Sequence, residues 1–522
     1  MSTALSWTEL STEASALRGA VVRPFSDLGS LLRFRASGLD ARGRRRMRSA
    51  GAVVLLLTVT AAVAPAYSSG AVDGSYVGKL VAVLPSIYAG FLVLAVISAA
   101  ASGGGREVVP RDQAVSFPVS STTDHLGALL LAPLNIAWLI QAWTLLGLTS
   151  YVAGPRLLWA TELPVLLWLL LATAIGQVVA WSLEWVRRGA HGQLMIRSLL
   201  GVLVVAAVTL VATGWVTVVF DHSPTVYVFI GALNGSVAGW STWGTTVAVL
   251  ALLAAGAIAA GAVPAHWAAR RAPRDEHRLE SGTYQPRADP LSDFRALVRI
   301  DRVGIWRSVP LRRGLLVLAL MPGLIAFAGH LSWSRLTILP GLVASGAALL
   351  FGINSWCLDG RGALWRDSLP VAPGLGFASR VWVLAEVLLG AAALTVVLAT
   401  VRAGAPTVSE VVALLGTTVA VTAQVVSASM RWSVRRPFSV DMRSARATPA
   451  PPVVMVGYST RLALATTFVG LVFSGLAGLP DWRLTALLAV VLVLVSAYRV
   501  ARTAARWADP ETRARVVVTV AG

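Results

Sequence analysis

Long stretches of apolar residues recur along the whole chain, and short polar segments separate them. About 18 to 20 consecutive apolar residues are enough for a helix to cross a bilayer. The pattern therefore predicts an all-α, multi-pass membrane protein with about twelve transmembrane helices. The predicted spans are 50–68, 80–101, 126–150, 159–182, 196–220, 243–264, 314–331, 337–357, 379–401, 408–430, 458–478 and 483–503.

The composition agrees with this interpretation. The chain has 522 residues, of which 56% are hydrophobic and 13% are charged, and its mean hydropathy is +0.71. A soluble protein of this size would carry about a quarter charged residues. The first apolar run follows the basic segment Arg42–Arg48 and a leader far longer than that of a signal peptide, so we expect a retained span.

The distribution of basic residues predicts the orientation of the chain. Of the 44 Lys and Arg residues, 39 fall in segments on the side of the N-terminus and 5 on the opposite side. Basic residues concentrate in cytoplasmic segments of membrane proteins. We therefore expect both termini in the cytoplasm and the chain in the plasma membrane. The net charge of +19 then indicates contact with membrane lipid, and binding to nucleic acid is disfavoured.

Four short matches in the same order indicate that the chain contains two similar halves. The first pairs Leu31–Leu39 with Leu297–Ile305, each preceding the first span of its half. The last pairs the segments beginning at Gln177 and Gln424. Each half has six spans, an even number, so the two repeats would be parallel in the membrane. We therefore expect six plus six transmembrane helices.

These matches also predict the boundaries of the parts. We expect a basic N-terminal segment with an amphipathic helix, a first transmembrane half, a cytoplasmic linker with a second amphipathic helix, a second transmembrane half and a cytoplasmic tail. They span 1–48, 49–266, 267–313, 314–506 and 507–522. The segment Asp221–Ser241 has two possible structures: it dips into the membrane interface or forms an exposed turn.

The residue inventory excludes several enzymatic functions. A phosphate-binding Walker loop requires a lysine in a GxxxxGK[ST] motif, and the chain's one lysine, Lys79, lies in a predicted outer loop. The single cysteine, Cys357, excludes an internal disulfide and a cysteine-built metal site. The six histidines lie in different segments without a zinc-binding pattern. We therefore expect a protein that is not an enzyme, with no catalytic residues, no cofactor and no metal site.

Two polar residues are candidates for the substrate path. Glu386 is the ionisable residue that lies deepest within a predicted span, and Asn135 lies beside the equivalent position of the first half. Ionisable residues inside the membrane often mark transport pathways. The alternative for Glu386 is structural, namely a hydrogen bond between helices or an ion pair with Arg380, and the residues favour it.

The segment "CLDGRGALWRDSLPVAP", Cys357–Pro373, is unusually charged for its place between two apolar runs. We expect the glycines to form a sharp turn after the eighth span. A short helix would follow, with Leu364, Trp365 and Leu369 toward the membrane and Arg366 and Asp367 toward water. A solvated hairpin between two spans is the alternative.

This segment, together with the span pattern, resembles the cytoplasmic loop of type 2 ABC export permeases, in the double-length form of antibiotic exporters. In that family, separate ATP-binding subunits, here expected as a dimer, hydrolyse ATP and contact this loop. The resemblance also makes Leu31–Leu39 and Leu297–Ile305 amphipathic helices on the inner membrane surface. It implies that the residues contacting the ATPase are Glu107 and Pro118 in the first half and Asp359, Gly360, Arg361, Arg366, Asp367 and Pro370 in the second.

The sequence leaves other function classes to be weighed. A twelve-span secondary, ion-coupled transporter is the main alternative, because such carriers are also built as six plus six helices. A membrane-embedded transferase is disfavoured, since no outer loop carries paired carboxylates. The favoured function is export of a hydrophobic or amphipathic substrate.

Overall fold

The structure is a computed structural model that describes residues 23–34, 37, 41–68, 74–101, 119–134, 136–215, 218–219, 222–271, 290–329, 331–439 and 449–522. All regular elements in these ranges are helical, so the predicted all-α class is confirmed for them. The chain divides into two compact units, an N-terminal unit of Met1–Arg274 and a C-terminal unit of Asp275–Gly522.

Many of the described helices can cross a membrane. In these ranges nine helices are long and apolar enough, and a bent pair of helices brings the number to ten. Nine of the twelve predicted spans coincide with these nine helices. The predicted spans 126–150, 196–220 and 314–331 do not, and they differ from the prediction in separate ways.

The predicted span 126–150 is not one continuous helix. It contains the end of α5 (Ser121–Leu131), the short η2 (Ala132–Leu134) and most of α6 (Ile136–Ala153). Pro133 lies within η2. A proline inside a helix removes one backbone hydrogen bond and clashes with the preceding turn, which accounts for the interruption.

The other two spans are shorter or bent. The range 196–220 begins inside α8 (Gly192–Ala212) and extends past its end. The range 314–331 coincides with most of α14 (Val309–Ala328), which meets α13 (Asp293–Arg307) at a bend of 83°. Ser308 is extended and α14 carries a proline in its first turn, a position that proline favours. α13 therefore runs in a different direction from α14.

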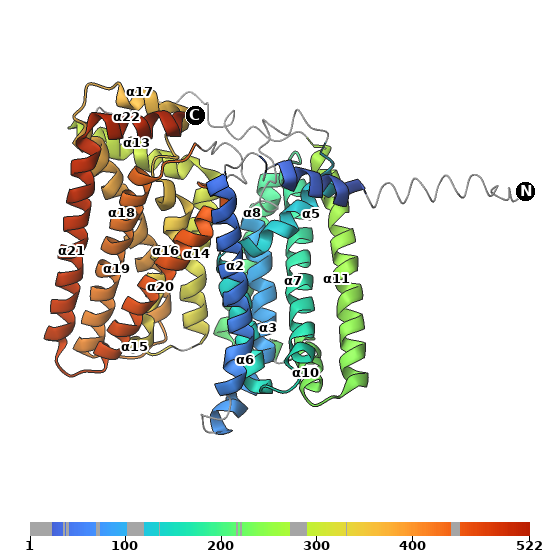
Figure 1. The fold of residues 1–522 in the computed structure, drawn as a ribbon. Helices are drawn as coiled ribbons and strands as arrows, with labels where there is room; N and C mark the ends of the chain where they lie inside the picture. The colour runs from blue at the N-terminus through green and yellow to red at the C-terminus, as the bar shows by residue number, and fades with distance from the viewer. Residues whose placement is uncertain are drawn as a thin grey trace, which may run out of the picture. The chain divides into compact units, whose positions relative to one another are not determined.

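In the N-terminal unit, α7 (Leu158–Arg187) is the central helix. It packs against α3 (Gly74–Ala101), α6, α10 (Thr225–Ser236) and α11 (Trp240–Ala269), as Figure 1 shows. α2 (Ala41–Val63) continues into η1 (Ala64–Ser68), and both contact α6. The unit is thus a bundle around one long, buried helix.

The segment that follows Asp221 is a packed helix and not an exposed turn. Its helix α10 buries Val228, Phe229 and Ala232 against α7 and α3. Phe229 lies 6.5 Å, between ring centroids, from Tyr88 of α3. The exposed-turn alternative for this segment is therefore wrong.

In the C-terminal unit, α19 (Val408–Arg435) has the central place. It packs against α16 (Leu339–Leu350), α18 (Pro373–Thr400), α20 (Pro452–Ala477) and α21 (Trp482–Ala508). Figure 1 shows α13, α17 (Ala363–Asp367) and α22 (Pro510–Ala521) together at one end of these helices and α15 (Trp333–Leu336) at the other. The two short 3₁₀ helices, η3 (Gly352–Asn354) and η4 (Gly360–Gly362), lead from α16 to α17.

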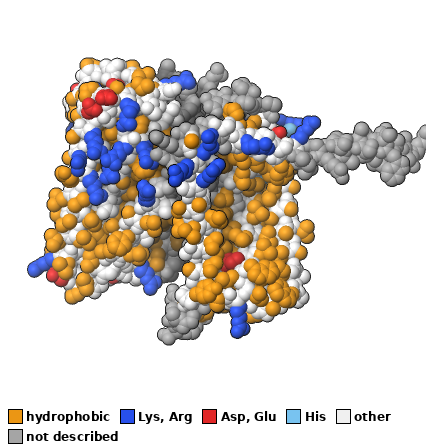
Figure 2. All heavy atoms as spheres, in the orientation of Figure 1, with side chains coloured by type: hydrophobic (Ala, Val, Ile, Leu, Met, Phe, Trp, Pro, Cys, Tyr) orange, Lys and Arg blue, Asp and Glu red, His pale blue; other side chains and the backbone are white. Residues whose placement is uncertain are grey.

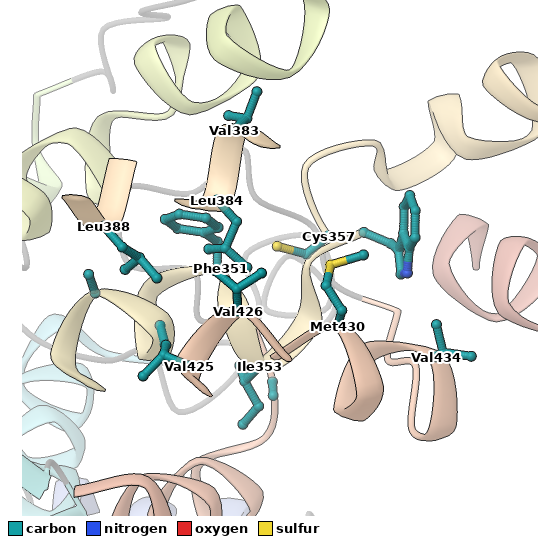
Figure 3. Packing of buried hydrophobic residues seen from close by; sticks show 14 of the residues in the cluster. Phe351, Ile353, Cys357, Val383, Leu384, Leu388, Val425, Val426, Met430 and Val434 are labelled. Carbon is teal, nitrogen blue, oxygen red and sulfur yellow. The ribbon is translucent and has the colours of Figure 1, made fainter. Parts of the chain in front are cut away.

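The core of the C-terminal unit includes buried side chains of α13, α17 and α22. Figure 3 shows Phe351, Cys357 and Met430 packed among branched side chains of α18 and α19. Close-packed branched side chains have few alternative rotamers, so they form a rigid base. The base supports the 359–370 loop, which contains η4 and α17.

Both predicted amphipathic helices contain helical residues. Residues 23–34 are helical, and Leu28 packs against Leu126 and Leu131 of α5. The end of the first predicted helix, after residue 34, lies largely outside the described residues. α13 buries Leu297 and Ile305 along one face, as an amphipathic helix does.

Candidate functional site

Four charged side chains form a buried cluster beneath the 359–370 loop. Arg366 of α17 donates to Asp301 of α13, with 3.1 Å from Nη2 to Oδ2, and to Asp359 Oδ1 at 3.1 Å. Arg380 of α18 lies 3.0 Å from Asp301 and donates to Asp359 Oδ2 at 2.8 Å. We call Asp301, Asp359, Arg366 and Arg380 the ion cluster.

The ion cluster is enclosed and well supplied with hydrogen bonds. The side chains of Asp301 and Arg380 are 1% and 2% exposed, and that of Arg366 is 11% exposed. Ser379 donates to Asp301 at 2.9 Å, and Arg380 donates to the carbonyl of Ser355 at 2.7 Å. Two carboxylates face two guanidinium groups, so the cluster has no net formal charge. Such pairing offsets the cost of burial, which is several kcal/mol per isolated charge.

The electrostatics of the ion cluster hold its acid and base in their charged forms. Burial alone would raise the pKa of Asp301, but the charge of Arg380 and the hydrogen bonds from Arg366 and Ser379 outweigh it. The pKa of Asp301 is therefore lowered. Burial would lower the pKa of Arg366, but the hydrogen bond to Asp301 and the charge of Asp359 raise it.

The predicted orientation of Arg366 toward water is therefore wrong. Helical periodicity within α17 cannot reveal that Asp301, 65 residues earlier, supplies a buried partner. Asp367 is exposed, as predicted, and pairs with Arg513 of α22, with 3.1 Å between Arg513 Nε and Asp367 Oδ1. Leu369 lines a cavity whose other walls include Val516, Val517 and Val520 of α22.

Other residues of the loop remain on the surface. Arg361, Leu364 and Trp365 are exposed, and so is Pro370. Gly360 has φ of +46°, a left-handed conformation that glycine adopts most easily, as the predicted sharp turn requires. The loop therefore combines an exposed basic and apolar surface with a buried, charged underside.

The C-terminal helix α22 covers one side of the loop, which the sequence did not predict. Val516, Val517 and Val520 are buried in the core of the unit. Trp507, just before α22, stacks on Trp356 with 4.2 Å between ring centroids and 7° between planes. The sequence does contain a signal for the start of this helix, because the side chain of Asp509 caps α22. The spacing of its apolar residues, however, does not show which element the helix packs on.

A cavity of about 60 Å³ lies between the loop and α22. Its lining includes Leu297, Trp356, Asp359, Arg366, Trp507 and Val516. This volume is well below the 300 Å³ or more of a typical small-molecule pocket. The cavity accommodates a few water molecules.

Of the two predicted substrate-path residues, Glu386 and Asn135, the structure describes only Glu386. Glu386 of α18 is 42% exposed and pairs with Arg302 of α13, with 2.8 Å from Oε2 to Nη2. The predicted hydrogen bond between helices is therefore confirmed, since Arg302 donates to Glu386 from another helix. The pairing with Arg380 is wrong, because Arg380 pairs with Asp301 and Asp359. Asn135, Glu107 and Pro118 lie outside the described residues.

The sequence did not predict that the carboxyl group of Glu162 is buried. Glu162 of α7 is 8% exposed, and neither carboxyl oxygen has a hydrogen-bond partner in the described part of the chain. It shares a helix face with the buried Val165 and Leu169. The sequence placed Glu162 near the end of a span, where water would be expected, but the packing of α10 and α3 on α7 encloses this region.

Comparisons with known proteins do not identify this chain. No family model, no curated protein and no solved structure matches it.

Among the described residues no group of three or more His, Cys, Asp and Glu side chains could hold a metal ion.

Proposed function

We propose that this chain is the membrane-spanning permease subunit of an ATP-binding-cassette exporter. It lies in the plasma membrane, with both termini in the cytoplasm and twelve spans arranged as two parallel six-helix repeats. It moves a hydrophobic or amphipathic substrate out of the cell. ATP is hydrolysed by a dimer of separate ATP-binding subunits, which contact the 359–370 loop.

The ion cluster is the observation that carries this proposal. Arg366 is bonded on one side to Asp301 of α13 and, through Asp359, to Arg380 of α18. A partner that pushes on the exposed Arg361 and Trp365 would therefore displace α13 and α18 together with the loop. Rigid, buried connections of this kind transmit motion between packed elements. This is the mechanical connection that a permease driven by an external ATPase needs.

The packing within each unit supports the two-repeat part of the proposal. α7 and α19 contain the fourth and tenth predicted spans, which are equivalent positions in the two halves. Each is the central helix of its own unit, and each packs on the helix of the last predicted span of its half, α11 or α21. Equivalent contacts at equivalent positions are expected of an internal repeat.

The proposal is tested by reversing one exposed charge of the loop. The chain is purified from its native membrane with any associated ATP-binding subunit, as the parent protein and as Arg361→Glu. We expect Arg361→Glu to keep a monodisperse chain but to lose most of the associated subunit and of the ATPase activity, because like charges at an interface cost several kcal/mol. Arg483→Glu makes the same charge change at the start of α21, the end of that helix away from the 359–370 loop. It should leave the associated subunit and the ATPase activity unchanged.

Glu162 favours a second candidate function, ion-coupled secondary transport. A buried carboxyl without a partner is costly in its charged form and is a common proton site in carriers. For a carrier, transport would follow a proton gradient without any ATPase, and Glu162→Gln would remove the coupling. For an ABC permease, transport would stop when the Walker lysine of the partner is removed. The gradient-driven result would overturn the proposed function.

A further inference from the structure

Five arginines lie in the last turns of α19 and α21, two helices that pack against each other. They are Arg431 and Arg435 of α19 and Arg499, Arg502 and Arg506 of α21. All five are exposed, and no acidic partner contacts them in the described part of the chain. Arg431, Arg502 and Arg506 are each close enough to Arg435 to act on its charge. We call these five residues the arginine patch.

The patch continues an apolar stripe along α21. Leu487, Val491 and Val495 are exposed and precede Arg499 at intervals of four residues, so their side chains form a row along α21 that leads to Arg499. The stripe from Leu487 to Arg499 is about 18 Å long at 1.5 Å per residue. An acyl chain that starts at the arginines and reaches the middle of a bilayer core, about 15 Å away, can lie along this stripe. Figure 2 shows Arg side chains gathered toward one end of the C-terminal unit, with mostly hydrophobic side chains between them and a few basic side chains at the opposite end.

We propose that the arginine patch binds the phosphate group of an anionic phospholipid, with its acyl chains along the apolar stripe of α21. Guanidinium groups bind phosphate through paired hydrogen bonds, and several of them repel one another unless an anion lies between them. An exposed apolar stripe that leads to a basic cluster matches a phospholipid in both shape and charge. A free phosphate ion would use the arginines but would leave the apolar stripe unexplained.

The test compares lipids added to the purified full chain in a neutral detergent. The measurement is the thermal unfolding midpoint together with lipid retention in native mass spectrometry. Phosphatidylglycerol should raise the midpoint and remain bound, whereas phosphatidylcholine should do so much less. Inorganic phosphate at the same concentration should give no shift.

Matched variants locate the effect. Arg502→Gln with Arg506→Gln should weaken phosphatidylglycerol binding by about tenfold or more, because two of the five charges that attract the phosphate group are removed. Arg335→Gln with Arg483→Gln removes the same charge at the opposite end of the unit and should leave binding unchanged. Arg502→Lys with Arg506→Lys keeps the charge and should give an intermediate affinity; it decides the test if the glutamine pair does not fold.

Several results would overturn the lipid assignment. Equal binding by the patch variant and the control variant would mean that the lipid binds elsewhere. An equal shift with inorganic phosphate would indicate a free-anion site. Loss of an acidic protein partner in the patch variant, without any change in lipid binding, would assign the patch to a protein interface.

Discussion

At the scale of single residues, the ion cluster shows how burial reverses a prediction. Arg366 lies in a short polar segment, where charged side chains ordinarily face water. Here Asp301 and Asp359 supply two carboxylates at hydrogen-bond distance, so Arg366 is drawn beneath the loop. Arg361, five residues earlier, has no such partner in the described part of the chain and stays exposed.

Removing one carboxylate from the ion cluster should destabilise the C-terminal unit strongly. Asp301→Asn would leave the buried Arg366 and Arg380 facing a single carboxylate, that of Asp359. Breaking a buried ion pair costs about 3–5 kcal/mol. We expect a clear drop in the unfolding midpoint of the purified chain. Asp367→Asn breaks a partly exposed pair and should cost at most about 1 kcal/mol; an equal loss in both variants would contradict the importance of the cluster.

The pH dependence of that same comparison follows from the lowered pKa of Asp301. A carboxyl group whose pKa is lower in the folded chain contributes its full stability above the unfolded pKa of about 3.9. This contribution is lost as the pH falls through the lower, folded pKa. The stability difference between the parent chain and Asp301→Asn should therefore be constant near neutral pH and shrink in strong acid.

At the scale of elements, α22 is the part whose role changes most from the sequence prediction. The tail 507–522 was predicted only as cytoplasmic, yet its helix packs on the 359–370 loop and on α21. The capping Asp509 and the following proline define where α22 begins. Three buried valines attach the helix to the core, each contributing on the order of 1.5–3 kcal/mol by burial.

Removing the ring of Trp507, which lies at the end of α21, should expose the single cysteine of the chain. Cys357 is buried beside Trp356, whose ring stacks on Trp507. We expect Trp507→Ala to increase the labelling rate of Cys357 with a thiol reagent by at least about tenfold, because truncating a buried tryptophan costs about 3–5 kcal/mol. Tyr498→Ala truncates an exposed aromatic residue of the same helix and serves as the control. Unchanged labelling in Trp507→Ala would show that the stacking of Trp507 on Trp356 does not protect Cys357.

At the scale of the whole molecule, the distribution of basic residues predicts the membrane topology. The 39 to 5 division of Lys and Arg predicts that both termini lie in the cytoplasm. Arg483, at the start of α21, and Gly522, at the end of the chain, are both exposed and lie on opposite predicted sides.

Cysteine labelling of intact cells tests this topology. In a Cys357→Ala background, Arg483→Cys should react with a membrane-impermeant thiol reagent, and Gly522→Cys should react only after the cells are opened. The physical reason is that moving basic segments across the membrane is disfavoured. Labelling of Gly522→Cys in intact cells would contradict the predicted orientation.

The sequence by itself determined what depends on local composition and spacing. The all-α class and nine of the spans follow from long apolar runs, because a bilayer demands a minimum helix length. Gly360 and the cap of α22 are also local features, since a left-handed turn and a helix start each depend on a few neighbouring residues.

Only the tertiary structure decided which distant side chains meet. Asp301 reaches Arg366 across 65 residues, and Arg302, rather than Arg380, pairs with Glu386 across 84. Glu162 is enclosed because α10 packs on α7, a contact that no periodicity encodes. Apolar runs report that a residue lies in a span, but lipid and protein are equally apolar surroundings. The face that each helix turns toward its neighbours is therefore decided by packing and buried charge pairing.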